Sequence, residues 1–199
     1  NDKKVIYTGY VCENLKKGNN SYTKKNEILV SAGGGAVGEK IILNAIKAAS
    51  EIDHNKFLWR IMIGLNESSN NINKYLNLAK KTNKNIVIEE FTGDFNYLLN
   101  DCRISISQGG YNTFVETLSS GIKSIIIPYS GDQRGDQLIR AEIFKTLKFV
   151  KFINEDQLSP KILRENIIQL LSQNLIQENL LRMDGADKFS KLLESLIDE

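Results

Sequence analysis

Several kinds of protein are disfavoured by what this sequence lacks. Its two cysteines, Cys12 and Cys102, lie far apart and neither belongs to a C-x-x-C pair, so a structural zinc site has no support. Its single histidine, His54, makes a Ser-His-Asp catalytic triad a poor explanation. No apolar run approaches the about 20 residues that a helix needs to span a bilayer. A net charge of +2 is too small to indicate binding of nucleic acid.

What the sequence does contain is the composition of an ordinary globular domain. Of its 199 residues, 41% are hydrophobic and 25% are charged, and a chain of this length can bury a real core. No low-complexity linker divides the chain. We expect the two cysteines to be reduced thiols, which predicts a cytoplasmic protein.

Short runs rich in branched and aromatic residues alternate with helix-like stretches. The strand-like runs are 5–11, 28–31, 57–63, 86–89, 104–107, 124–128 and 149–153. The helix-like stretches are 38–52, 71–81, 95–100, 112–120, 136–146, 160–171 and 175–197. Ser159 and Pro160 predict an N-cap followed by proline at the first helical position. The repeated order of strand and helix predicts one α/β domain with a Rossmann-like, doubly wound parallel sheet.

Glycines collect at one edge of this predicted sheet. Ten of the fourteen glycines follow the ends of predicted strands, namely Gly33, Gly34, Gly35, Gly38, Gly64, Gly93, Gly109, Gly110, Gly131 and Gly135. Glycine has no Cβ, so a ligand can approach its backbone closely. Ligands of doubly wound sheets bind at the carboxyl ends of the strands. The sequence therefore predicts a ligand site at this edge.

The first glycine cluster leaves a dinucleotide site open as an alternative. Gly33, Gly35 and Gly38 have the spacing G-x-G-x-x-G between a strand and a helix. That pattern also needs an acidic residue at the end of the next strand to bind a ribose. Asp53 precedes that strand, and Glu67 is the remaining candidate. NAD is therefore the weaker alternative, and the feature that remains is a glycine turn that directs backbone N–H groups at an anion.

The second glycine cluster has the same design. Gly109 and Gly110 lead into a helix whose first turns contain Thr113 and Glu116. One interpretation is a capping box, because Thr113-x-x-Glu116 is that motif. The other is a ligand site, because two helix N-termini at one cleft attract a diphosphate and a nearby carboxylate can accept hydrogen bonds from a sugar diol.

An ordered set of motifs is more specific than any one of them. The set consists of the glycine loop at 33–38, F-x-x-D-F, S-x-G-G-x-N-T-x-x-E, a strand that ends in Pro128, and D-Q. Together with the lead-in VIYTGYV, it resembles the donor-binding half of GT-B glycosyltransferases of family 28. The best-known member of that family makes the lipid-linked disaccharide of bacterial peptidoglycan. This chain is most similar to the branch described as predicted glycosyltransferases.

The resemblance implies a domain organisation. It makes 1–199 a single nucleotide-sugar-binding domain, one half of a GT-B fold, with 1–27 as an interdomain lead-in and 175–199 as a C-terminal helix. The N-terminal acceptor-binding domain is then absent from this sequence, and the expected partners are that domain or subunit and a nucleotide-sugar donor. The partner domain is also expected to provide any peripheral contact with the inner face of the membrane.

The resemblance also implies roles for individual residues. Phe91 and Thr92 match the place where the nucleobase packs, and Glu116 matches the glutamate that binds the ribose hydroxyls. The residues that match loops around the phosphates are Gly33, Gly34, Gly35, Gly109, Gly110, Tyr111, Asn112 and Thr113. Asp136 and Gln137 match a polar pair on the hydroxyls of the donor sugar. Gln108 departs from the pattern, because an arginine is usual there in the peptidoglycan enzyme.

The expected reaction follows from the resemblance. A sugar moves from a UDP-sugar, for example UDP-N-acetylglucosamine, to an acceptor hydroxyl by an inverting displacement. No D-x-D occurs in the sequence, so we expect neither metal nor cofactor, and Arg134 or Arg140 are candidates for added positive charge. The general base is expected in the partner domain, so this domain alone is expected to be inactive. A nucleotide-sugar hydrolase or epimerase and a non-catalytic donor-binding subunit remain alternatives.

Overall fold

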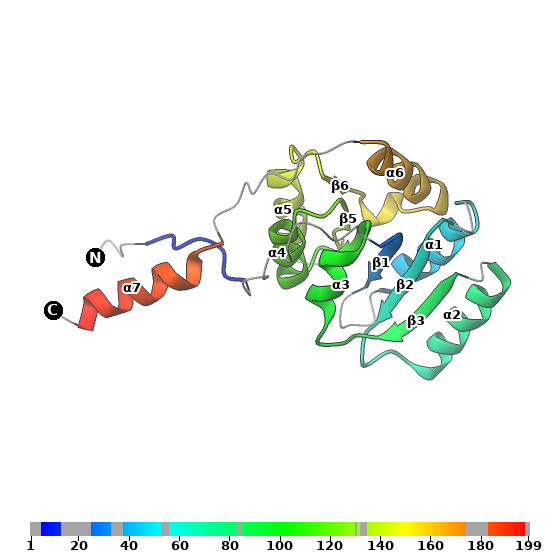
Figure 1. The fold of residues 1–199 in the computed structure, drawn as a ribbon, viewed down its shortest axis with the longest axis horizontal. Helices are drawn as coiled ribbons and strands as arrows, with labels where there is room; N and C mark the ends of the chain where they lie inside the picture. Colours follow the sequence, from blue (N-terminus) through cyan, green and yellow to red (C-terminus); the bar gives the residue numbers. More distant parts are fainter. Residues whose placement is uncertain are drawn as a thin grey trace.

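A parallel sheet forms the centre of the chain (Figure 1). The computed structural model describes residues 5–12, 25–32, 38–52, 56–82, 85–129, 131, 135–173 and 183–197. Its strands are β1 (Glu27–Ser31), β2 (Leu58–Ile63), β3 (Ile86–Glu90), β4 (Ile104–Gln108), β5 (Ser124–Ile127) and β6 (Val150–Phe152). Its helices are α1 (Glu39–Ala49), α2 (Ser69–Thr82), α3 (Phe95–Asp101), α4 (Tyr111–Ser120), α5 (Asp136–Phe144), η2 (Glu155–Gln157), α6 (Pro160–Ser172) and α7 (Gly185–Ile197).

The strands lie in the order β3-β2-β1-β4-β5-β6, and every pair of neighbours is parallel. The chain builds outward from β1 to β3, returns to the centre, and then builds outward again from β4 to β6. The crossover between β3 and β4 therefore reverses the direction of growth beside β1. Such a reversal point is where doubly wound sheets bind their ligands. The predicted α/β, Rossmann-like fold is confirmed.

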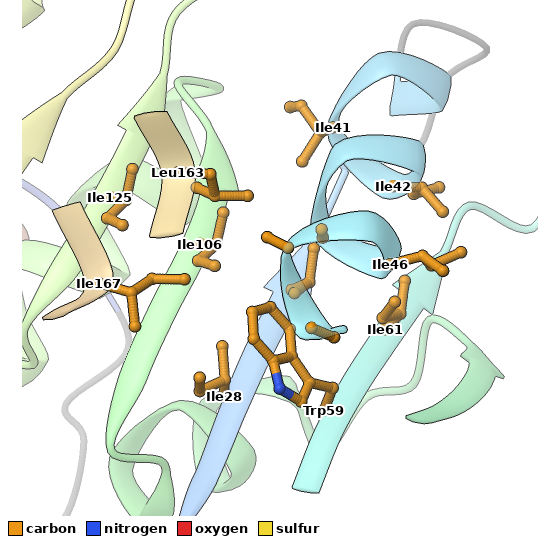
Figure 2. Close-up of a cluster of buried hydrophobic side chains, with 14 of the residues drawn as sticks. Ile28, Ile41, Ile42, Ile46, Trp59, Ile61, Ile106, Ile125, Leu163 and Ile167 are labelled. Atoms are coloured by element: carbon orange, nitrogen blue, oxygen red, sulfur yellow. The ribbon is translucent and has the colours of Figure 1, made fainter. Parts of the chain in front are cut away.

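The larger core lies between the sheet and helices α1, α2 and α6. Figure 2 shows isoleucines of α1 above Trp59 and Ile61 of β2, and Leu163 and Ile167 of α6 near Ile106 and Ile125. Trp59 is 1% exposed, and the isoleucines of this cluster are also buried. Full burial of a side chain of this size stabilises the fold by about 1.5–3 kcal/mol. This face of the sheet therefore anchors the domain.

The opposite face is covered in two parts by shorter helices. Leu29 and Met62 of the sheet pack with Phe95 and Leu99 of α3. A separate cluster joins α4 and α5 to the sheet through side chains that include Phe114, Val115, Leu118, Ile126, Phe144 and Val150. Alternate residues of β1 enter different clusters, as the period of two in a strand requires.

A charged network occupies the part of this face over β1, β2 and β3. The guanidinium of Arg60 donates from Nε to Glu27 at 2.8 Å and from Nη1 to both carboxylate oxygens of Glu89 at 2.6 Å. Its hydrogen bonds, first to Glu27 and then to Glu89, raise the pKa of Arg60. The Glu27 side chain is only 6% exposed, whereas that of Glu89 is 37% exposed. The ion pair with Glu27 is thus the buried part of the network.

Most predicted elements lie where the sequence places them. Ser159 caps α6, because its hydroxyl accepts from the N–H of Ile162 at 3.3 Å, and Pro160 is the first helical residue. Among the described residues, no helix is both long and apolar enough to cross a membrane. Cys12 and Cys102 form no disulfide, and their thiols donate to the hydroxyl of Ser119 at 3.6 Å and to the carbonyl of Leu99 at 3.2 Å.

The predicted strand over residues 5–11 is wrong. This segment is irregular, and only Val11 pairs, in an isolated antiparallel bridge to Asp184. The N–H of Gly185 donates to the carbonyl of Tyr10 at 3.1 Å, so the segment runs beside the start of α7 and not beside the sheet (Figure 1). Within this segment, the ring of Tyr10 lies 6.5 Å from that of Tyr111 and 6.3 Å from that of Phe144, so Tyr10 packs against α4 and α5.

The predicted C-terminal helix is shorter at its start than expected. Of the range 175–199, residues 175–182 and 198–199 lie outside the described residues. Met183 and Asp184 are not helical, and α7 begins at Gly185. The bridge from Asp184 to Val11 uses extended backbone, which a helix cannot provide. A Cβ at Gly185 would lie 2.7 Å from the carbonyl oxygens of both Gly9 and Tyr10, so the close contact requires glycine.

The two carboxylates on Arg60 should differ in their contribution to stability. Glu27→Ala leaves a guanidinium without its buried partner and should lower the free energy of unfolding by about 1–3 kcal/mol. Glu89→Ala removes a half-exposed partner and should cost less than about 1 kcal/mol. Urea unfolding followed by circular dichroism measures both changes. Equal losses for the two variants would contradict this division of the network.

Candidate functional site

The carboxyl ends of β1 and β4 meet at the reversal point of the sheet. Ser31 and Ser107 are register partners at these ends, and both side chains are buried. The chain leaves β1 toward α1 and leaves β4 toward α4, so both helices begin at the same edge but on opposite faces. The predicted convergence of two glycine-rich helix starts at one edge is therefore present, and Gly109 and Gly110 lie there.

The first of the two turns is described only at its ends. Gly33, Gly34 and Gly35 lie outside the described residues, so their predicted contact with phosphates stays a prediction. Gly38 is the N-cap of α1, and a Cβ at this position would lie 2.1 Å from the Cβ of Ala32. The two ends of the loop, Ala32 and Gly38, therefore lie in close contact, which is possible because Gly38 has no side chain.

The second turn ends at Gly110, and this excludes the capping-box interpretation. Gly110 is the N-cap of α4, with φ −57° and ψ 144°, and its carbonyl accepts the N–H of Phe114 at 2.9 Å. Thr113 is already the third residue of the helix, so it cannot cap the helix start. The extended ψ of Gly110 lets the helix begin soon after the strand, three residues earlier than the capping box requires.

The side chains of this second turn differ in exposure. Tyr111 and Asn112 are exposed, whereas Thr113 and Glu116 are half-buried. Within the first turn of α4, no side chain accepts a hydrogen bond as an N-cap, so the backbone N–H groups there are not capped by the chain's own N-cap residue. Uncapped N–H groups at a helix start favour an anion.

The loop after β5 brings two predicted site residues to the second turn. The backbone N–H of Tyr129 donates to Oε1 of Gln137 at 2.9 Å, and a Cβ at Gly109 would lie 3.1 Å from that same oxygen. Asp136 accepts from Nη1 of Arg140 at 2.7 Å. Gln137 and Asp136 thus lie at the carboxyl edge, where Gln137 holds the backbone at Tyr129 and Asp136 pairs with Arg140.

Phe91 and Thr92 follow β3 on the same edge. The N–H of Phe91 donates to the carbonyl of Ile63 at 2.9 Å, and its ring lies 5.2 Å from that of Phe95. The hydroxyl of Thr92 accepts the N–H of Asp94 at 3.2 Å. Both side chains are exposed. β3 is three strands from β4, or about 14 Å at ordinary strand spacing, so this pair lies at a distance from the second turn.

Glu67, the remaining candidate for an NAD ribose, is engaged at the start of α2. Its Oε1 accepts from the N–H of Ser68 at 3.1 Å and from Nδ2 of Asn71 at 2.8 Å. Its Oε2 accepts the hydroxyl of Tyr75 at 3.4 Å. Burial, and then the charge of Glu67, raise the pKa of Tyr75 above its ordinary value. The carboxylate therefore helps to fix the loop, and Asp53 lies outside the described residues.

Sequence reasoning considered Arg140 only as a source of charge. Arg140 belongs to α5, and its side chain reaches the second turn, with contacts to Gly109, Tyr111 and Asp136. No local pattern signals this arrangement, since Gly109 precedes Arg140 by 31 residues. Arg134, the other candidate cation, lies outside the described residues.

A cavity of about 650 Å³ lies at another place, beside the edge strand β6. Its lining includes Lys145, Leu147, Lys148, Val150, Lys151 and Phe152. None of the predicted site residues contributes to this lining. The cavity is therefore separate from the edge where the two helices begin.

Comparison with known sequences connects this geometry to a family. Residues 28–196 match the model of the glycosyltransferase family 28 C-terminal domain. Among curated proteins, the UDP-N-acetylglucosamine--N-acetylmuramyl-(pentapeptide) pyrophosphoryl-undecaprenol N-acetylglucosamine transferase of Staphylococcus epidermidis is 28% identical over 212 residues, covering 100% of this chain and 57% of that protein. The chain spans about half the length of the curated relatives it matches.

Solved structures share the fold at low sequence identity. MurG of Acinetobacter baumannii superposes with a TM-score of 0.69 at 15% identity, covering 87% of this chain and 51% of that one. UDP-GlcNAc 2-epimerase of Neisseria meningitidis, bound to UDP-GlcNAc, superposes with a TM-score of 0.59 at 17% identity, covering 89% and 46%. At these identities the likeness concerns the fold alone.

The close return of the first turn can be tested with a pair of glycines. Gly38→Ala should lower the free energy of unfolding by about 1–3 kcal/mol, because the new Cβ overlaps Ala32. Gly93→Ala is the control, since a Cβ there meets nothing within 4 Å. It should lose no stability, because alanine restricts the unfolded chain. Thermal and urea unfolding compare the two, and an unchanged stability of Gly38→Ala would contradict the tight turn.

Proposed function

The chain belongs to glycosyltransferase family 28 as a C-terminal domain of that family, and we propose that it binds the nucleotide-sugar donor of a sugar-transfer reaction. The observation that carries the proposal is the pair of helix starts, α1 and α4, at the reversal point of the sheet. Backbone N–H groups and the positive ends of two helix dipoles there favour a diphosphate.

The donor is proposed to lie along the carboxyl edge of the sheet. The diphosphate contacts the turn at Gly109, Gly110, Tyr111, Asn112 and Thr113, together with the loop at Gly33, Gly34 and Gly35. Glu116 accepts hydrogen bonds from the ribose hydroxyls, and its half-buried place in α4 supports a fixed carboxylate. The nucleobase packs at Phe91 and Thr92, which follow β3 on the same edge.

Asp136 and Gln137 are proposed to face the donor sugar. Asp136 accepts from Arg140 through one carboxylate oxygen, and Gln137 accepts from the N–H of Tyr129 through its amide oxygen. A carboxylate has about four acceptor positions, and an amide adds two N–H donors. Holding the backbone and contacting sugar hydroxyls are therefore compatible roles for this pair.

We propose a uridine diphosphate sugar as the donor. The name of the curated relative from S. epidermidis specifies UDP-N-acetylglucosamine as its donor, which supports the nucleotide more than the sugar. The turn of this chain has Gln108 where the resemblance leads us to expect arginine. A neutral side chain at that place removes a positive charge near the donor, so calorimetry with different UDP-sugars is the measurement that identifies the sugar.

The proposed chemistry is a single inverting displacement without metal. The acceptor oxygen bonds to the anomeric carbon, the bond from that carbon to the diphosphate breaks, and the nucleoside diphosphate leaves with the electron pair. The acceptor proton passes to a general base. Helix ends and N–H donors stabilise the charge that develops on the leaving group. The base is proposed to come from a partner domain, so the domain alone transfers no sugar.

An N-terminal acceptor-binding domain is the proposed partner. Two observations support it. The curated relatives are about twice as long as this chain, and α7 has exposed apolar residues at Phe189, Leu193, Leu196 and Ile197. The neighbouring lead-in adds exposed Val5, Ile6 and Tyr7. Any membrane contact is proposed to occur through this partner, on the cytoplasmic side.

A nucleotide-sugar epimerase or hydrolase is the second candidate. The superposition on an epimerase bound to UDP-GlcNAc supports this second candidate, because that protein has the same fold and binds a nucleotide sugar. A non-catalytic subunit that binds the donor at the carboxyl edge of the sheet is the third candidate. The candidates separate in the whole protein, where an acceptor-dependent release of UDP identifies a transferase.

The domain alone should bind UDP and the UDP-sugar without transferring the sugar. With half of the site present, we expect a dissociation constant on the order of 0.1–1 mM. Isothermal titration calorimetry with UDP, ADP, GDP, dTDP and NAD measures the preference. Equal or tighter binding of NAD would support a dinucleotide domain and reject the donor proposal.

Glu116→Gln should weaken UDP binding more than it weakens the fold. Loss of a charged acceptor for a ribose diol should cost about 1.5–3 kcal/mol of binding free energy. The unfolding free energy should fall by no more than about 1 kcal/mol, since Gly110 and not the Thr113–Glu116 pair begins the helix. Glu165→Gln on α6 is the matched control and should change neither quantity. Normal UDP binding by an early-melting Glu116→Gln would return Glu116 to a structural role.

A further inference from the structure

Arg140 connects the helix after β5 to the turn after β4. Its Nη2 donates to the carbonyl of Gly109 at 3.1 Å, and its Nη1 donates to Asp136 at 2.7 Å. Its guanidinium carbon lies 5.8 Å from the ring centre of Tyr111 and 5.9 Å from that of Phe114. One side chain therefore touches the last residue before the Gly110 N-cap and two aromatic residues in the first turn of α4.

We call the contacts of Arg140 with Gly109, Asp136, Tyr111 and Phe114 the Arg140 clamp, and its side chain is largely buried. The Arg140 side chain is 16% exposed, and its Nε is buried without a hydrogen-bond partner among the described residues. A buried unpaired N–H group costs about 1–3 kcal/mol. The side chain keeps this position nonetheless. Its Nη2 bonds to the turn at Gly109, its Nη1 bonds to Asp136 of its own helix, and its guanidinium lies over the rings of Tyr111 and Phe114.

Charge alone does not explain the contact. The turn and the start of α4, residues 107–115, contain no cationic residue, so Arg140 brings a positive charge to a neutral segment. Asp136 pairs with it at 2.7 Å and offsets most of that charge at longer range. The remaining effect of Arg140 is geometric, since a planar guanidinium can donate to two acceptors and stack on a ring at the same time.

We propose that Arg140 is a positioning residue for the donor-binding turn, holding Gly109 and the start of α4 against α5. It acts through the turn and does not touch the donor. The ligand part of this inference rests on the proposed function. The clamp itself is a property of the ligand-free protein, so it can be tested without any nucleotide.

The clamp makes a specific claim about substitution. Lysine keeps the positive charge but cannot form the two forked hydrogen bonds and the stacking contact together. Arg140→Lys and Arg140→Gln should therefore behave alike. A purely electrostatic role would instead separate them, with the lysine variant close to the wild type. Arg164→Gln is the matched control, because Arg164 pairs with Glu51 between α6 and the end of α1.

Hydrogen–deuterium exchange of the ligand-free chain tests the clamp. Both Arg140 variants should exchange about tenfold faster than the wild type in peptides that cover residues 114–120, whose N–H groups are bonded within α4 from Phe114 onward; a tenfold change corresponds to about 1.4 kcal/mol. Peptides from α6 should be unchanged, and Arg164→Gln should leave residues 114–120 unchanged. Unaltered exchange at 114–120, or faster exchange spread evenly over the whole chain, would overturn the proposal.

Calorimetry with UDP then tests the consequence for the donor. Both Arg140 variants should bind UDP about tenfold more weakly than the wild type, while Arg164→Gln binds normally. Normal UDP binding by Arg140→Lys would show that charge and not position matters, and would overturn the inference. A wild-type chain that binds no UDP would reject the proposed function, whereas the exchange result would still decide the clamp.

Discussion

The parallel pairing of β1 with β4 is the constraint on which the rest of the molecule depends. Because these strands are neighbours and run the same way, the helices that follow them begin at the same edge. The right-handed crossovers put α1 and α4 on opposite faces, so the two helix starts border one crevice. A strand order in which β1 and β4 were not neighbours would separate the glycine turns, however well each turn was formed.

At the carboxyl edge of the sheet, side chains hold the loops in place, whereas backbone N–H groups are the proposed contacts for the ligand. Glu67, Gln137 and Arg140 bond to neighbouring groups and thereby hold the loops after β2, β5 and β4. The backbone N–H groups at the start of α4 have no side-chain cap from Gly110. A rigid frame of side chains around uncapped N–H groups suits a ligand that carries phosphate oxygens, since little reorganisation is needed on binding.

The lead-in and α7 form a second unit that depends on long-range contacts. The Val11–Asp184 bridge and the approach of Gly185 to Gly9 and Tyr10 join the two ends of the chain. Exposed apolar side chains remain on both segments, including Tyr7 and Phe189. Contiguous exposed apolar residues are typical of interaction surfaces, which agrees with the proposed partner domain on this side.

The sequence by itself determined the kind and order of the elements and the edge on which the glycines collect. These features follow from local periodicity and from the backbone freedom of glycine, which need no knowledge of distant contacts. The sequence was misleading where a short pattern is compatible with two different structures. The apolar run at 5–11 pairs with the start of α7 and not with the sheet, and Thr113 resembles an N-cap although Gly110 already begins the helix.

Only the tertiary structure decided which strands are neighbours and which side chains hold the turns. The order β3-β2-β1-β4-β5-β6, the bond from Tyr129 to Gln137 and the contact of Arg140 with Gly109 depend on how separate segments pack. Gly109 and Arg140 are 31 residues apart, and no sequence spacing reports a distance of that kind. Their contact exists because β4 and β5 are adjacent parallel strands, which brings the end of one loop beside the next helix.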